Sequence, residues 1–286
     1  MREFASGLHL AEAPRWHDGR LWISDMWDHK VWSFDADGGR RLEHDFGPDE
    51  DPGGLGWLPD GRLLVVGMEG RRVYRSDGAD FVVHAELADH SPWQCNDMTV
   101  APDGTAYVSH FGWDLFGRTT PYALTTLLRI TPDGTVAVAA LDLASPNGIT
   151  IRDGGRSLVV SESGASKLTS FRIGADGSLH DRATFADLPP AAGVPVAPPD
   201  GICSDADGGI WIGEPIGRRV LRVDRAGHVT DEMSFDVHPL AVCLGGADRR
   251  TLFVCLAGQH EKLSRRPEPM ASVVAVDVDV PGAGIP

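Results

Sequence analysis

The sequence contains little of what marks several common classes of protein. Four cysteines occur in 286 residues, and none belongs to a C-x-x-C pair. Neither a zinc knuckle nor a thiol redox site is therefore indicated, and buried free thiols are expected. No run of about 18 apolar residues predicts a membrane helix, and the N-terminus lacks an apolar signal segment, so we expect a cytoplasmic protein. A Gly-x-Ser-x-Gly elbow is also missing, which disfavours serine-hydrolase chemistry.

Positive charge is scarce as well. The 26 Lys and Arg residues are outnumbered by 41 Asp and Glu residues, which leaves a net charge of −15. A strongly acidic protein repels phosphate backbones and anionic membrane surfaces, so we expect no nucleic-acid partner and no membrane partner. Cations and a small-molecule substrate fit this charge better. The sequence leaves the oligomeric state open.

Long stretches with apolar residues at helical spacing are missing too, whereas 34 Gly and 20 Pro separate many short apolar runs. This pattern predicts strands joined by turns. Six segments repeat a turn, a strand, a gap and a second strand, and their first turns fall at Asp18, Asp60, Asp103, Asp153, Asp207 and Asp248. The separations of 42, 43, 50, 54 and 41 residues are typical of propeller blades. The sequence predicts a single all-β domain over residues 1–286, a six-bladed β-propeller with four-stranded blades around a central channel.

One Asp-Gly pair does not fit this repeat. Ten such pairs occur, and the repeat explains nine of them as turns that precede or follow a strand. The remaining pair, Asp200–Gly201, precedes a segment whose turn comes seven residues later, at Asp207. Asp200 is therefore a candidate for a chemical role.

Polar residues of three other blades share the register of Asp200. Four blades carry Glu12, Asn96, Asn147 and Asp200 six or seven residues before the opening turn, and the other two carry Gly53–Gly54 and Ala241–Val242. Equivalent positions on the innermost strands form a ring, so the four side chains should converge at one mouth of the channel. Two carboxylates and two amides favour a hard divalent cation such as Ca²⁺, Mg²⁺ or Mn²⁺, although Zn²⁺ and Fe²⁺ also accept carboxylates. A single Asn-Gly or Asp-Gly dipeptide, taken alone, is usually a plain turn.

The order and spacing of four short motifs indicate a family. The stretches "EAPRW", "CNDMTVAPDG", "SPNGI" and "PDGICSDADGGIWIG" together resemble the regucalcin/gluconolactonase family of metal-dependent lactonases, from Glu12 to the last repeat. The resemblance implies one divalent metal held by Glu12, Asn147 and Asp200, with Asn96 contacting the substrate directly or through water. It also implies that Asp200 orients or deprotonates the attacking water. The alternative is that Asp200 binds the metal and takes no proton, because a metal-bound carboxylate is a weak base.

The sequence departs from the sugar-lactone members of that family at the substrate side. They resemble R-x-N-D where this chain reads "QCND", so Gln94 replaces an arginine that would hold substrate oxygens. The loop at 110–126 lacks a corresponding glutamate and offers four aromatic residues instead, namely Phe111, Trp113, Phe116 and Tyr122. Together with the apolar loop at 188–199, these residues predict a pocket for a less polar substrate. Lid packing or a subunit contact is the alternative role for the aromatic residues.

Other titratable residues are weaker candidates. His110, Asp114 and His260 offer acid–base groups, but a histidine outside the shared register is more often a surface or core residue. Glu162 and Glu214 follow the first strands of the fourth and fifth blades, where a carboxylate is usually just solvated.

Three functional hypotheses follow. The first is metal-dependent hydrolysis of a lactone or related cyclic ester, with a substrate less polar than a simple aldonolactone. The second keeps the metal but changes the reaction, because related propellers include other esterases and strictosidine-synthase-like proteins. The third is a non-catalytic propeller that binds a metal or a partner protein.

Overall fold

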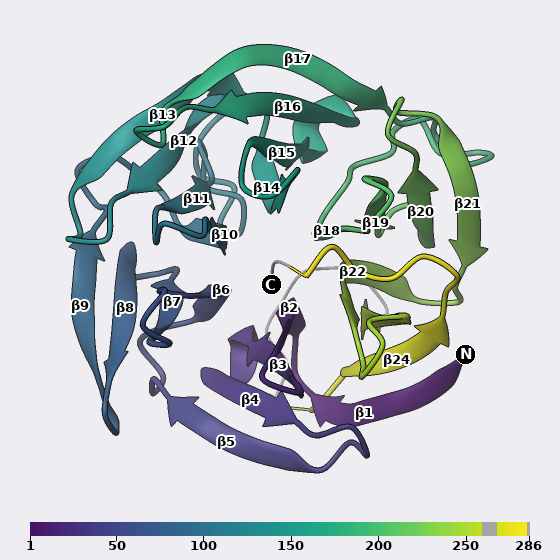
Figure 1. Cartoon of the computed structure of the whole chain (residues 1–286), viewed down its shortest axis with the longest axis horizontal. Helices are drawn as coiled ribbons and strands as arrows, with labels where there is room; N and C mark the ends of the chain where they lie inside the picture. The colour runs from purple at the N-terminus through teal and green to yellow at the C-terminus, as the bar shows by residue number, and fades with distance from the viewer. Residues whose placement is uncertain (259–267, 285–286) are drawn as a thin grey trace.

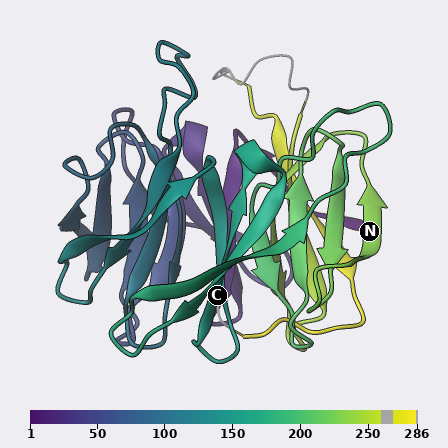
Figure 2. The same ribbon diagram turned by 90° about the horizontal axis from the view of Figure 1, so that it is seen from above.

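Six four-stranded antiparallel sheets are arranged around a central axis in the computed structural model, which describes residues 1–258 and 268–284 (Figure 1). Apart from strands, the described chain contains only two short 3-10 turns, η1 (Met26–Asp28) and η2 (Ser163–Ala165). The predicted six-bladed β-propeller with four-stranded blades is therefore confirmed. Seen edge-on, the strands run between the two ends of the propeller (Figure 2).

The first three blades follow one another along the chain. The first holds β2 (Ala11–His17), β3 (Arg20–Asp25), β4 (Lys30–Phe34) and β5 (Arg40–Asp45). The second holds β6 (Pro52–Trp57), β7 (Leu63–Gly67), β8 (Arg72–Asp77) and β9 (Asp80–Glu86). The third holds β10 (Cys95–Val100), β11 (Ala106–His110), β12 (Thr125–Ile130) and β13 (Val136–Leu143).

The remaining blades complete the circle. The fourth holds β14 (Pro146–Arg152), β15 (Ser157–Glu162), β16 (Lys167–Ile173) and β17 (Leu179–Asp187). The fifth holds β18 (Ile202–Ser204), β19 (Ile210–Glu214), β20 (Arg219–Val223) and β21 (Val229–Ser234). The sixth holds β22 (His238–Gly245), β23 (Thr251–Ala257), β24 (Ala271–Asp277) and β1 (Arg2–Leu8).

The sixth blade joins the two ends of the described chain. Strand β1 pairs antiparallel with β24, with Arg2 opposite Ala275 and Leu8 opposite Ala271. The sequence repeat begins at the second strand and assigned no role to residues 2–8. The pairing explains them, because the outer edge of the last blade would otherwise lack a strand.

Apolar side chains fill the space where the first blade meets the sixth. Phe4 of β1 lies edge-on to Phe253, with ring centroids 4.8 Å apart, and Phe34 lies 6.3 Å away. Trp16 stacks on the same Phe253 ring at 5.6 Å. These contacts hold the closing strand to the inner strands.

The Asp-Gly turns of the repeat lie at one end of the blades. In blades two, three and five the glycine nitrogen donates a hydrogen bond to the carbonyl three residues earlier, and φ is positive at Gly61, Gly104 and Gly208. Glycine suits this backbone because it has no Cβ to clash. The innermost strands begin at the opposite end, so the predicted site residues and the turns lie at different ends of the channel.

Buried free thiols were expected, and the cysteines are free. Cys95, Cys243 and Cys255 are buried, whereas Cys203 is half-buried. Among residues 1–258 and 268–284, no helix reaches the length and apolar character needed to cross a bilayer. The cytoplasmic location stays a prediction.

The Phe4 contacts should contribute measurably to stability. We expect Phe4→Ala to lower the free energy of unfolding by about 3 kcal/mol, because it removes a buried ring from the closing strand. Urea unfolding measures this change. The matched control is Glu3→Ala on the exposed face of the same strand. Equal losses for the two variants would contradict a stabilising role of the ring.

His110, at the end of β11, should make stability depend on pH. Its side chain is buried, and burial lowers its pKa from 6.5 to about 4. The folded protein therefore resists a proton that the unfolded chain accepts below pH 6.5, so stability should fall as pH drops from 6.5 to 4.

Replacing His110 by Gln should remove about 3 kcal/mol of that acid-dependent loss, as one pKa unit corresponds to about 1.4 kcal/mol. Thermal unfolding between pH 7 and 4 checks this, with His228→Gln at an exposed position as the control. A His110→Gln variant with the pH profile of the parent protein would contradict the assignment.

Candidate functional site

The four polar residues of the shared register line one pocket at the start of the innermost strands. Glu12 lies in β2, Asn96 in β10 and Asn147 in β14, while Asp200 lies two residues before β18. All four border a cavity of about 560 Å³. Below it, a passage of about 10 Å³ is bordered by Glu12, Asn96 and Asn147 and by the residues that the other two blades carry in this register, Gly53, Gly54, Ala241 and Val242. Residues that share one register in the sequence repeat therefore lie at one level of the channel.

Irregularities in the inner strands accompany these positions. Pairing shifts by a residue between Glu12 and Arg15, between Cys95 and Met98, and between Pro146 and Ile149. A bulge of this kind bends a strand and re-aims a side chain. The shift occurs at the ligand register in each of these blades, which explains how residues near strand ends face a common space.

The glycines beside the site residues serve close packing between blades. A Cβ at Gly148 would lie 2.6 Å from the Ile202 nitrogen, and a Cβ at Gly201 would collide with the Ala241 side chain. Neither glycine has a positive φ. Gly201 is therefore not needed for a left-handed backbone, and it instead lets two inner strands approach each other.

Negative charge accumulates at the floor of the pocket. Burial, with Asp200 and Asp97 nearby, raises the pKa of Glu12 well above its usual value. Burial and the Asp97 carboxylate also raise the pKa of Asp200 to about 7, and a hydrogen bond from Asn147 partly offsets this rise. Both carboxyl groups therefore hold a proton more readily than they would in water, first because they are removed from water and second because negative charge lies nearby.

Arg15 is the basic side chain that partly compensates this charge. Its Nη2 lies 2.7 Å from Asp97 Oδ1 and 2.6 Å from the Met98 carbonyl oxygen. Both Arg15 and Asp97 are buried beside the narrow passage. When all three carboxyl groups are ionised, they and the one guanidinium leave two negative charges, which a divalent cation would neutralise.

The sequence analysis missed this ion pair. Arg15 and Asp97 stand within the quoted motifs "EAPRW" and "CNDMTVAPDG", beside Glu12 and Asn96 respectively. Both residues are therefore part of the family motifs. The alternation of residues along the strands did not indicate that their side chains lie beside the channel.

Apolar side chains form the walls of the pocket above this charged floor. They are Leu10, Met26, Phe111, Trp113, Leu115, Phe116, Tyr122, Pro198, Pro199, Pro215, Ile216 and Leu240. The rings of Trp113 and Tyr122 lie 5.9 Å apart, and Trp113 Nε1 donates to Ser145 Oγ at 3.3 Å. Residues from both predicted loops, 110–126 and 188–199, thus border the pocket.

Gln94 is placed differently. It does not appear among the pocket residues in the described part of the chain. Its side-chain Nε2 donates to Glu69 Oε2 at 3.3 Å, and its main-chain carbonyl oxygen accepts from the Phe111 nitrogen at 3.0 Å. A direct contact of Gln94 with substrate stays a prediction.

The weaker titratable candidates have structural partners away from this pocket. Asp114 accepts from the Gly117 nitrogen at 2.8 Å and so shapes its own loop. Glu162 lies 3.4 Å from both Lys167 Nζ and Arg182 Nη2, and Glu214 lies 2.9 Å from Arg219 Nε. Both glutamates are buried in ion pairs, not solvated. His110 is buried against Thr126, and His260 lies outside the described residues.

A second group, one histidine and two aspartates, has ligand atoms within 4.8 Å of one another, namely His9, Asp25 and Asp28. Asp25 already accepts hydrogen bonds from the His9 and Leu10 nitrogens, and Asp28 lies 2.9 Å from Lys30 Nζ. Because a lysine and backbone amides already bind these oxygens, the three residues are better suited to stabilising the local structure than to binding a cation.

Known proteins resemble this chain along most of its length. Residues 10–258 match the family described as the SMP-30/gluconolactonase/LRE-like region. The 6-deoxy-6-sulfogluconolactonase of Pseudomonas putida is 28% identical over 163 residues, which cover 56% of this chain and 55% of that protein. The chain thus spans about half the length of that relative.

Solved structures share the fold. A luciferin-regenerating enzyme has a TM-score of 0.79 at 15% identity, with 98% of this chain and 95% of that chain covered. Regucalcin of Agrobacterium tumefaciens, described as a calcium-binding protein, has a TM-score of 0.78 at 18% identity with the same coverage. At these identities the likeness shows the fold alone. The family match includes all four residues of the ring, and the predicted resemblance is confirmed: the chain belongs to the SMP-30/gluconolactonase/LRE-like family.

Proposed function

We propose that the protein hydrolyses a lactone, or a related cyclic ester, with one divalent metal held by Glu12, Asn147 and Asp200. The observation that carries this proposal is the convergence of the oxygen-bearing side chains of Glu12, Asn147 and Asp200 on one otherwise apolar pocket. The name of the Pseudomonas putida relative, a sulfogluconolactonase, supports the reaction class.

The donor set fits a hard divalent cation. Glu12 and Asp200 offer carboxylate oxygens and Asn147 offers an amide oxygen, and a divalent cation would balance the two negative charges that the ionised floor carries. When bound, such an ion would polarise the lactone carbonyl and stabilise the negative charge that develops on its oxygen. The printed description of regucalcin as calcium-binding makes Ca²⁺ the first ion to test, with Zn²⁺, Mn²⁺, Mg²⁺ and Fe²⁺ beside it.

Asp200 is the candidate base. Its carboxylate borders the pocket beside Glu12 and Asn147, within the space where a lactone and its attacking water would lie. In the proposed step, Asp200 takes a proton from water while the water oxygen bonds to the carbonyl carbon. The ring C–O bond then breaks, and the leaving oxygen receives the proton that Asp200 took from water, which gives a hydroxy acid and restores the Asp200 carboxylate.

Neighbouring residues keep this carboxylate in place. Asn147 donates a hydrogen bond to Asp200, and the Asp200 nitrogen donates to the Gly213 carbonyl at 2.8 Å. Asn96 borders the same pocket and is the proposed substrate contact. Arg15 fixes Asp97, so the charge beside Glu12 and Asp200 does not move.

The walls favour a less polar lactone than an aldonolactone. Phe111, Trp113 and Phe116 border the pocket, and no Lys or Arg does so among the described residues. A polyhydroxylated substrate would lose hydrogen bonds to water on entering such a space. An aromatic or alkyl-substituted lactone would instead bury apolar surface against the rings.

The test is hydrolysis by metal-stripped protein resupplied with each of the five ions separately, across a panel from gluconolactone to aromatic lactones. We expect one or more ions to restore activity, with kcat/KM highest for an aromatic lactone. Asp200→Asn should lower kcat by about 10²–10⁴-fold, the usual contribution of a general base.

The matched control is Asp207→Asn, in the exposed Asp-Gly pair seven residues later, which should retain activity. Metal binding without turnover of any lactone would remove the lactonase assignment. A preference for gluconolactone would instead contradict the proposed substrate polarity while leaving the reaction class intact.

A further inference from the structure

Asp200 differs from the other ring residues in how its main chain is held. Glu12, Asn96 and Asn147 lie within inner strands that pair with the second strand of the same blade. Asp200 instead follows residues 188–199, which form no strand. Segments without regular pairing open more easily than paired strands. A side chain that acts at a fixed point after such a segment therefore needs other contacts to hold it.

Hydrogen bonds fix the peptide group on the N-terminal side of Asp200. Its nitrogen donates to the Gly213 carbonyl of β19 at 2.8 Å, and Ser163 Oγ donates to the Pro199 carbonyl at 2.5 Å. Proline also restricts its own φ to a narrow range. Both polar atoms of this peptide group are therefore bonded, one to blade five and the other to η2 in blade four.

The peptide group on the C-terminal side is fixed in the same way. The Gly201 nitrogen donates to the Leu240 carbonyl of blade six at 2.9 Å. The Asp200 carbonyl accepts from Ser161 Oγ at 2.8 Å and from the Gly148 nitrogen at 3.3 Å. Two fixed peptide groups determine φ and ψ of the residue between them. They therefore also determine the direction in which the Asp200 side chain leaves the main chain.

Buried serines occupy one repeated position beside the ring. Ser24, Ser109 and Ser161 are the last residue but one in β3, β11 and β15, and all three are fully buried. A buried hydroxyl costs free energy unless it is hydrogen-bonded. The hydroxyls of Ser24 and Ser109 donate to the Gly53 and Asp97 carbonyls at 2.6 and 3.3 Å. Ser161 differs from them because its acceptor belongs to a residue that we propose as both ligand and base.

We propose that Ser161 and Ser163 are positioning residues, which direct the Asp200 carboxylate into the pocket by holding the carbonyls of Pro199 and Asp200. This inference rests on the proposed function, in which Asp200 binds the metal and takes a proton from water. Among the described residues, these serines supply the two side-chain donors to the peptide groups that flank Asp200. Ser161 acts through Asp200 and does not itself border the pocket in the described part of the chain.

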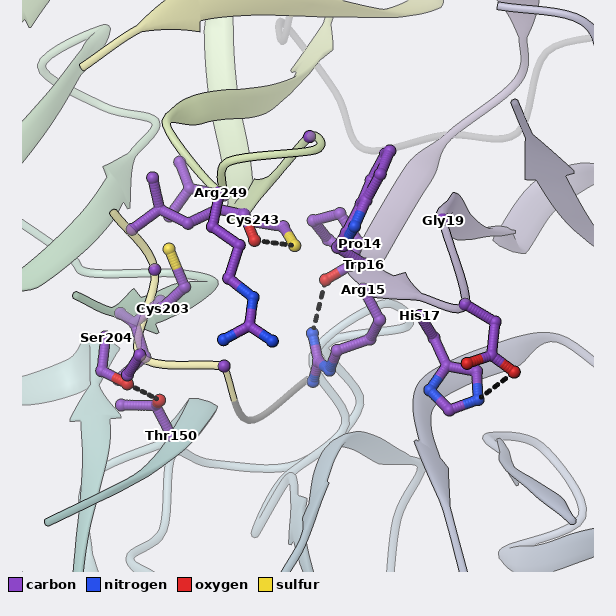
Figure 3. A pocket seen from close by; sticks show the side chains of 18 of the residues that line it. Pro14, Arg15, Trp16, His17, Gly19, Thr150, Cys203, Ser204, Cys243 and Arg249 are labelled. Atoms are coloured by element: carbon purple, nitrogen blue, oxygen red, sulfur yellow. Dashed lines mark hydrogen bonds and ion pairs between the residues drawn. The ribbon is translucent and has the colours of Figure 1, made fainter. Parts of the chain in front are cut away.

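The same two blades share another hydroxyl contact at the other end of the channel. There Thr150 Oγ1 of β14 donates to Ser204 Oγ of β18 at 3.2 Å, beside a cavity of about 430 Å³ (Figure 3). Both residues are buried, and Asp200 does not border that cavity. Ser204→Ala therefore removes a buried hydroxyl that joins blades four and five but does not bind the Asp200 main chain. It is the matched control.

The test is the affinity of the full chain for Mn²⁺, followed by the EPR signal of the free ion during titration. We expect Ser161→Ala to weaken Mn²⁺ binding about tenfold, because the loss of a residue that orients a ligand usually has an effect of this size. Ser163→Ala, at a half-buried position, should weaken it as well. Ser161→Cys should behave like Ser161→Ala, because a thiol fills the space but donates weakly. Ser204→Ala should leave the affinity unchanged.

A second readout needs no metal. In the metal-free protein, Ser161→Ala should speed hydrogen exchange of the Asp200 and Gly201 amides, measured by NMR at one pH, because the peptide group between them loses a bond. In Ser204→Ala these two amides should keep the exchange rates of the parent protein. A general loss of stability would instead speed exchange throughout the chain.

Three results would each overturn the inference: affinity and exchange in Ser161→Ala equal to those of the parent protein, equal losses in Ser161→Ala and Ser204→Ala, or a Ser161→Cys variant with the parent affinity. Failure of the proposed function is distinguishable. A parent protein that binds Mn²⁺ but hydrolyses no lactone removes the lactonase assignment, while weaker binding in Ser161→Ala still supports the positioning role. If the parent protein bound no Mn²⁺, the metal site would fail, and exchange at Asp200 would decide whether Ser161 holds it.

Discussion

The close approach of the innermost strands at one end of the channel determines the geometry of the site. At Gly54, Gly148 and Gly201 an added Cβ would meet the backbone or side chain of the next blade. Blades that approach this closely bring residues of equal register to one level around the axis. The bulges at the same positions then leave Glu12, Asn96 and Asn147 facing one pocket.

The close approach of the inner strands also brings carboxyl groups together at the floor of the pocket. Carboxylates held together in a buried space raise one another's pKa. Their mutual repulsion is removed when one of them binds a proton or when a cation binds between them. Arg15 compensates one carboxylate, Asp97, and so leaves Glu12 and Asp200 available. The walls above them are mostly apolar, so few polar groups of the protein compete for a cation at the floor. Packing, charge and pocket polarity are therefore consequences of one arrangement of strands.

The repeat of turns was enough to predict the number of blades and the register of the four ring residues. It could not predict β1 in the sixth blade, because pairing between residues 2–8 and 271–277 leaves no local periodic signal. Nor could it predict the Arg15–Asp97 pair, whose members belong to different blades and meet only through the channel. The burial of Glu162 and Glu214 depends on cationic partners from neighbouring strands, which sequence position alone does not reveal.

The central claim is that a divalent metal binds at the ring, and a crystal structure of the protein grown with Mn²⁺ tests it most directly. The account predicts an anomalous peak coordinated by oxygens of Glu12, Asn147 and Asp200, at distances of about 2.0–2.6 Å. A peak at His9, Asp25 and Asp28 with none at the ring would contradict it. So would a ring that stays metal-free while Glu12 and Asp200 share a proton.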